Sequence, residues 1–86
     1  MKLKVTFDNG GTEEVDVLPG DIVRFERQYG ISSQEADKQP RVEHALFLAH
    51  RALTRTKRTS EEFDTWLDTV VDVDPVAEVP LDQPDS

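Results

Sequence analysis

The chain has 86 residues, no cysteine and a net charge of −8, so it has room for one small domain and offers neither a disulfide framework nor a thiolate metal site. All ten Lys and Arg lie in residues 1–58, whereas residues 59–86 carry nine Asp or Glu and no basic residue; this imbalance argues against a nucleic-acid partner, because an excess of cations is needed to neutralise phosphates. No segment approaches the ~20 apolar residues of a membrane span, and none has the pattern of a signal peptide, so we expect an intracellular protein with no membrane partner.

The alternation of apolar and polar residues over 2–18 predicts a β-hairpin. A two-residue loop at Asn9-Gly10 would place apolar residues opposite charged ones. A three-residue loop, Asn9–Gly11, instead pairs Val5 with Val15 and Leu3 with Val17. Because one face must stay apolar, we predict the three-residue loop, with glycine in the left-handed position.

A short helix is predicted over residues 21–29, with Asp21 as its N-cap and Gly30 as its left-handed stop. Glu26 lies on the apolar face of this helix. A buried carboxylate needs a cationic or hydrogen-bonding partner. His44, or an arginine of the next helix, is the expected partner.

The connector 31–39 contains Ser32 and Glu35, which are spaced for a one-turn capping box. Pro40 suits the first turn of the next helix. Apolar residues at steps of three and four predict that this helix covers about residues 40–56 and a second one about residues 60–71. The apolar positions are Val42, Leu46, Ala49 and Leu53 in the first helix, and Phe63, Trp66, Leu67, Val70 and Val71 in the second.

Thr59 and Glu62 are spaced as a capping box for the second helix. After Val71 the chain is acidic, rich in proline and without aromatic residues, so we expect a disordered acidic tail over residues 72–86. The predicted fold is therefore α+β. It consists of a hairpin and three helices in a single domain, residues 1–71. We assign Phe25, Tyr29, Leu46, Leu53, Phe63, Trp66 and Leu67 to its core.

Phe47 is the residue that does not fit the apolar stripe of its helix. At 100° per residue it points roughly 140° away from Val42, toward the face expected to meet water. A second apolar point would let one helix contact two neighbours, within the chain or in another molecule. We therefore predict a partner-binding surface on this helix, formed by Phe47, His50, Arg51 and Thr54.

Catalytic and metal-binding patterns are not found in the sequence. His44 and His50 lie about 120° apart around a helix, whereas metal-binding pairs share one face. No nucleophile or phosphate-binding motif is present. The basic group Arg51, Arg55, Lys57 and Arg58 suits a helix C-terminus better than a nucleic-acid patch. We predict no enzyme activity, no catalytic residues, no metal and no cofactor.

Three segments carry a family resemblance in their order: D-I-V-R-F-E-R-Q-Y-G (21–30), E-H-A-L-F-L-A-H-R-A-L (43–53) and F-D-T-W-L-D-T-V-V-D-V (63–73). Over residues 21–73 the chain resembles the small tail assembly chaperones of long-tailed phages, especially those of actinobacterial hosts. Those proteins have a comparable F-E-R-x-[FY]-G helix, an E-x-x-x-W-L-A-W-x-A-like helix, and F-x-x-[FW]-L-D-x-[VI] before an acidic tail. Phe47 and His50 stand where the family's tryptophans are expected, so an aromatic platform would be reduced to Phe47.

The resemblance implies a non-enzymatic protein that coats the long tape measure protein in the host cytoplasm and keeps it soluble. It also implies recruitment of the tail tube protein, a homo-oligomer, and absence from the mature virion. Many members are made in two lengths by ribosomal frameshifting, so the tail at 72–86 would be an end or a linker to an extension. Two rival hypotheses are a small structural virion component of the tail or head-tail junction, and an acidic inhibitor that mimics nucleic acid.

Overall fold

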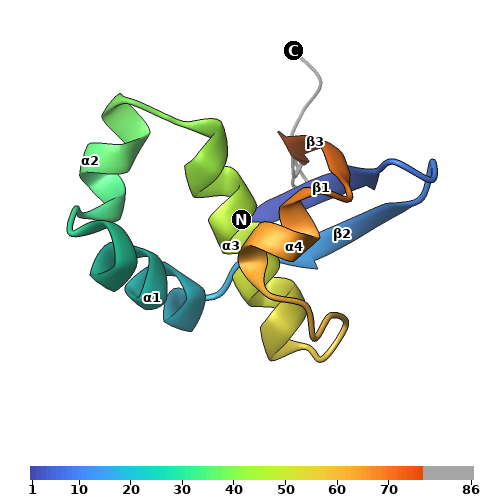
Figure 1. Cartoon of the computed structure of the whole chain (residues 1–86). Coiled ribbons are helices and arrows are strands. Elements are labelled where there is room, and N and C mark those ends of the chain that lie inside the picture. The colour runs from blue at the N-terminus through green and yellow to red at the C-terminus, as the bar shows by residue number, and fades with distance from the viewer. Residues whose placement is uncertain (77–86) are drawn as a thin grey trace, which may run out of the picture.

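A computed structural model describes residues 1–76 and shows an α+β fold, as predicted. In chain order its elements are β1 (Lys2–Phe7), β2 (Thr12–Asp16), α1 (Pro19–Tyr29), α2 (Ser33–Lys38), α3 (Val42–Arg55), α4 (Phe63–Leu67) and β3 (Val70–Pro75). The strands form one antiparallel sheet in the order β2-β1-β3. Figure 1 shows α3 between this sheet and α1.

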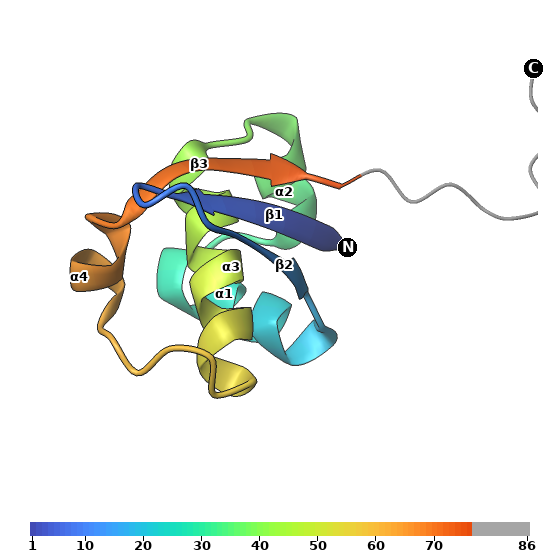
Figure 2. The same cartoon turned by 90° about the vertical axis from the view of Figure 1, so that its right-hand side faces the viewer.

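The main core lies between the sheet and α3, with α4 closing one end. It contains Leu3, Val5, Val15 and Val17 from the strand region, Ala49, Ala52 and Leu53 from α3, and Trp66 from α4. The two alanines let the α3 backbone approach the sheet closely, while branched residues fill the space around them. Figure 2 shows the strands running across α3. Of the residues assigned to the core from sequence, Phe25, Leu53 and Trp66 are buried, and Tyr29, Leu46, Phe63 and Leu67 are half-buried.

The hairpin and the three-residue length of its loop are confirmed, but the position of the loop and the pairing register are wrong. Val15 pairs with Leu3 and not with Val5, a difference of two residues, and Val5 pairs with Glu13. The loop is Asp8–Gly10: the Phe7 N–H donates to the Gly11 carbonyl, the Gly10 N–H donates to the Phe7 carbonyl, and Gly10 takes the left-handed conformation at φ 87°. An apolar face is kept because a register difference of two residues preserves the alternation of faces.

The prediction of one helix over residues 60–71 is correct only in its middle part. Residues 63–67 are helical, whereas residues 70–75 form a strand. The structure has a five-residue helix, α4, with Glu62 and not Thr59 at its N-cap, followed by β3. Val73 pairs with Val5 in the central strand, which places β-branched side chains on the core face of the sheet. Val71 is the extra residue of a bulge opposite Thr6 and Phe7, so it is exposed.

The same strand corrects the boundary predicted at residue 71. Residues 72–75 of the predicted tail belong to the sheet, and Val76 donates its N–H to the Lys2 carbonyl at 2.9 Å. The rest of the predicted tail, residues 77–86, lies outside the described residues. The folded body therefore extends to the end of β3, because the central strand β1 takes a partner on each side.

Asp21 is not the N-cap of the first helix, which starts earlier, at Pro19, with Leu18 as N-cap. The Asp21 carboxylate accepts the backbone N–H of Leu18 at 3.0 Å from within the first turn. Its main partner lies on α3. Arg55 forms a salt bridge with Asp21 at 3.1 Å, and the Asp21 side chain is completely buried.

α3 begins at Val42 with Arg41 as its N-cap, so Pro40 lies just before the helix and not in its first turn as predicted. Two other helix ends agree with their sequence signals. Gly30 ends α1 in the left-handed conformation at φ 68°, and Ser32 caps α2 by accepting the Glu35 N–H at 3.1 Å. Glu26 has a hydrogen-bonding partner, but it is neither His44 nor an arginine. Its carboxylate accepts the Ser33 N–H at 2.8 Å and so satisfies a free donor at the start of α2.

Candidate binding surfaces

A continuous row of ring contacts joins the three segments that carry the family resemblance. The aromatic row consists of Tyr29, Phe25, His44, Phe47, Phe63, His50, Trp66 and Phe7. Neighbouring ring centroids are between 4.9 and 6.4 Å apart. The row starts on α1, crosses the outer side of α3 and reaches the sheet through α4. Ring pairs at these separations stabilise packing beyond simple area burial.

Phe47 lies in the middle of this row and does not stand free in solvent. Its ring centroid is 6.3 Å from Phe25, 5.4 Å from Tyr29 and 5.8 Å from Phe63, and the residue is half-buried. Its predicted direction, away from the sheet, agrees with these contacts. The expected exposure is wrong, because α1 and α4 pack against that side of α3.

The part of Phe47 that stays accessible lines a shallow hollow between α1 and α3, of about 350 Å³. We call it the arginine hollow; its lining residues are Arg24, Arg27, Gln28, Phe47 and Arg51. Within residues 1–76 the salt bridges are those of Arg55 with Asp21 and Arg58 with Glu13, so none of the three hollow arginines is in one. The Arg51 Nε atom is also shielded from solvent without a hydrogen-bond partner. The hollow thus presents cations beside an aromatic ring.

Sequence reasoning found Phe47 and Arg51 but missed Arg24 and Arg27. The available signal was their i, i+3 spacing, which places them on one face of α1. The missing information was tertiary, because only the packing of α1 on α3 brings that face beside Arg51.

The other two predicted partner-binding residues lie elsewhere on α3. His50 is buried, and its Nε2–H donates to the Glu61 carbonyl at 2.8 Å, which leaves little of the ring for a partner. Thr54 is half-buried and lines a separate hollow of about 610 Å³ with residues 57–61. The structure therefore joins Phe47 with Arg51, and it separates both from His50 and Thr54.

Two arginines of the basic group at the end of α3 have a structural role. Arg55 Nη2 donates to the Asp16 carbonyl at 2.9 Å, and Arg58 Nη1 donates to the Glu14 carbonyl at 3.2 Å. Both arginines also pair with carboxylates, those of Asp21 and Glu13. They fasten the C-terminal end of α3 to β2, which agrees with the structural interpretation of this cluster.

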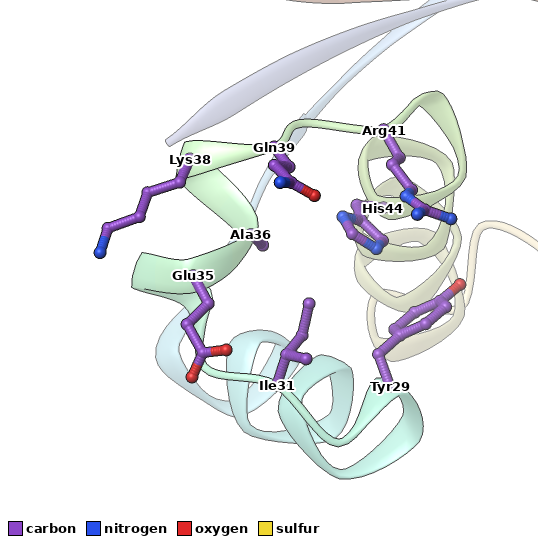
Figure 3. A pocket seen from close by; sticks show the side chains of 8 residues that line it. All are labelled: Tyr29, Ile31, Glu35, Ala36, Lys38, Gln39, Arg41 and His44. Atoms are coloured by element: carbon purple, nitrogen blue, oxygen red, sulfur yellow. The ribbon is translucent and has the colours of Figure 1, made fainter.

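A second hollow lies between α2 and the helices on either side, with a volume of about 570 Å³. We call it the α2 hollow; its lining residues are Tyr29, Ile31, Glu35, Ala36, Lys38, Gln39, Arg41 and His44. Figure 3 shows the Ile31 side chain pointing into it, with His44 facing it from α3. The His44 Nδ1 atom is buried and has no hydrogen-bond partner within the described chain. The α2 hollow therefore combines the apolar side chains of Ile31 and Ala36 with the His44 ring, and charged residues surround them.

Two carboxylates crowd each other on the solvent face of β3. Asp72 and Asp74 are two residues apart on the strand, both are exposed, and Asp74 is paired with Lys4 in the sheet register. Hydrogen bonding and like-charge repulsion from Asp72 raise the pKa of the Asp74 carboxyl above its ordinary value, against the opposing effect of Lys4. A nearby cation from outside the monomer would relieve this repulsion.

Residues 1–76 contain no group of three or more His, Asp or Glu placed to hold a metal ion. The arginine hollow and the α2 hollow are open, and each combines charged with apolar groups. In the described part of the chain, no helix has the length and apolar character needed to cross a membrane.

Comparison with protein-family models, with curated proteins and with solved structures finds no match to this chain. The residues that carry the family resemblance can still be placed in the fold. Phe25 and Tyr29, Phe47 and His50, and Phe63 and Trp66 come from three separate segments, and all six lie in the aromatic row.

Proposed function

We propose that this chain is a non-enzymatic tail assembly chaperone that binds and solubilises a phage tape measure protein in the host cytoplasm. Support comes from the aromatic row, where the three resembling segments meet. We propose the tail tube protein, further copies of the chain and a longer frameshifted form as its other partners.

We assign the tape measure contact to the α2 hollow. Ile31 and Ala36 give it an apolar interior of a size suited to a side chain of an amphipathic helix, and charged residues surround the opening. Phe47 and Arg51 belong to the other hollow and are assigned to contacts between copies of the chain. Many copies with weak individual contacts suit a long, repetitive partner, because multivalent binding multiplies modest affinities.

The test is co-expression with the tape measure protein encoded by the same genome. The wild-type chain should raise the soluble fraction of the tape measure protein and be captured with it. Ile31→Arg places a charge in the apolar interior, so capture should weaken by about tenfold or more, equivalent to about 1.4 kcal/mol. Val42→Arg is the matched control, because Val42 is 70% exposed and outside the hollow. Equal capture by both variants would contradict the assignment of the contact.

A second measurement addresses the function itself. Mass spectrometry of purified particles should detect the tape measure and tail tube proteins without this chain. Stoichiometric amounts of the chain in finished particles would show that it is a virion component and not an assembly chaperone.

A further inference from the structure

The arginine hollow has an uncompensated positive charge on a protein whose net charge is −8. Arg24 and Arg27 come from α1 and Arg51 from α3, and no salt bridge within residues 1–76 involves them. A cationic guanidinium binds carboxylates through planar, bidentate hydrogen bonds. The chemistry of the hollow therefore fits a pair of carboxylates presented on a rigid backbone.

Such a pair lies on the opposite side of the same molecule. Asp72 and Asp74 project from the solvent face of β3, where their mutual repulsion is only partly offset by Lys4. Residues i and i+2 of a strand are separated by ~6.6 Å. Arginines at i and i+3 of a helix present their Cβ atoms ~5–6 Å apart. Each carboxylate of the pair can thus meet its own guanidinium.

We propose that the Asp72–Asp74 pair of one copy docks in the arginine hollow of a second copy. Val71 beside the pair is 63% exposed and supplies an apolar group for the accessible part of Phe47. The contact brings cations to two crowded carboxylates, and it brings carboxylates to three arginines that form no salt bridge within residues 1–76. It rests on the self-association part of the proposed function and does not depend on the tape measure contact.

The two surfaces cannot meet within one copy, because α3 lies between α1 and β3 (Figure 1). The contact therefore joins different copies, and each copy carries one hollow and one strand surface. In the heterologous arrangement a copy uses its hollow for one neighbour and its strand for another. Repetition of such a contact produces a ring or an open filament. An open filament would present the α2 hollow at regular intervals along an extended partner.

The experiment measures the self-association of the purified full chain by analytical ultracentrifugation. Wild type should assemble, and assembly should weaken as NaCl is raised from about 0.05 to about 0.5 M, because salt screens exposed charges. Arg27→Glu reverses one charge of the arginine hollow, and Asp74→Lys reverses one charge of the strand surface. Each variant alone should therefore associate at least about tenfold more weakly than wild type. Lys57→Glu and Asp37→Lys, which reverse exposed charges outside both surfaces, are the matched controls and should assemble as wild type does.

Mixing the two variants gives the decisive measurement. The Arg27→Glu chain keeps its strand surface and the Asp74→Lys chain keeps its hollow, so an equimolar mixture should associate although neither variant associates alone. Circular dichroism verifies that both variants are folded.

A monomeric wild type, an unaffected single variant, or a mixture that does not associate would overturn the proposal. An effect of Arg27→Glu without an effect of Asp74→Lys would also overturn it, since another acidic segment would then fill the hollow. Tape measure capture is measured separately, so its loss would count against the proposed function and leave this contact standing.

Discussion

Asp21 connects three parts of the chain through one buried carboxylate. It accepts the Leu18 N–H at the start of α1 and pairs with Arg55 at the end of α3, whose Nη2 also reaches the Asp16 carbonyl of β2. A buried carboxylate is tolerated when hydrogen bonds satisfy it on several sides. The position where the sheet, α1 and α3 meet is thus fixed by a polar contact and not by the apolar core.

Asp21→Ala should therefore lower the free energy of unfolding by about 3 kcal/mol, because it leaves the Leu18 N–H and the Arg55 guanidinium without their acceptor. Asp21→Asn keeps an oxygen for the Leu18 N–H and should cost less. Urea unfolding followed by circular dichroism measures both changes. Asp37→Ala on the exposed surface of α2 is the control and should have almost no effect.

Tyr29 gives the fold a specific sensitivity to alkaline pH. Partial burial, and then the hydrogen bond donated to Glu43 at 3.1 Å, raise the pKa of the Tyr29 hydroxyl from 10.0 to about 12. Between these values the unfolded chain loses a proton that the folded chain keeps. The stabilisation is present below pH 10 and is lost as the pH rises toward 12.

Tyr29→Phe should remove this part of the alkaline loss of stability, while the loss due to other groups remains. Tyr29 is the only tyrosine of the chain, so the ultraviolet absorbance of tyrosinate reports its titration directly. A midpoint near pH 10 in the folded protein would contradict the contact with Glu43.

At the level of elements, the sequence pattern misassigns the type of β3, and it also treats the segment that forms α2 as a connector, so that it predicts three helices instead of α1 to α4. Val70 and Val71 continue the helical spacing of Phe63 and Trp66, so periodicity alone extends the helix. The chain instead ends α4 at Leu67 and pairs the following residues with β1. The alternation of valine and aspartate in V-D-V-D is the signal for a strand, but a run this short fits either structure until its partner is known.

Val73 and Val71 provide a matched test of this strand. Val73→Asp places a charge on the half-buried core face and should lower the free energy of unfolding by about 1–2 kcal/mol. Val71→Asp, at the exposed bulge, should change it by less than about 0.5 kcal/mol. Thermal or urea unfolding of the two variants distinguishes them. Equal effects would be incompatible with the pairing of β1 and β3.

Local signals predicted several elements well, because they depend on neighbouring residues. The cap formed by Ser32 and Glu35, the stop at Gly30 and the alternating faces of the hairpin follow from short-range chemistry. The hairpin register and the start of α1 were wrong because a glycine one position earlier and a tertiary partner for Asp21 decided them. Caps and turns can be read from the sequence, whereas the choice between equivalent registers needs the rest of the fold.

Across the whole molecule, α3 is covered on both sides, by the sheet on one and by the aromatic row on the other. This explains why the direction of Phe47 was predictable and its environment was not. The sequence placed an aromatic residue opposite the apolar stripe, but nothing local to α3 showed that α1 and α4 would return to cover it. The α3 residues of the arginine hollow, Phe47 and Arg51, could therefore be predicted from the sequence of one helix. Its α1 residues, Arg24 and Arg27, could be identified only from the assembled fold.

The sheet order has a kinetic consequence. Its central strand, β1, is made first, whereas one of its two partners, β3, comes after every helix, as the pairing of Val5 with Val73 shows. Closing a loop of this length is entropically costly before any contact is gained, and such non-local pairing slows folding. On the ribosome, β1 can at first pair only with β2, and its other edge stays unpaired until residue 75 has emerged. The sheet is therefore completed only after β3 has been synthesised, and until then the open edge of β1 can pair with other chains.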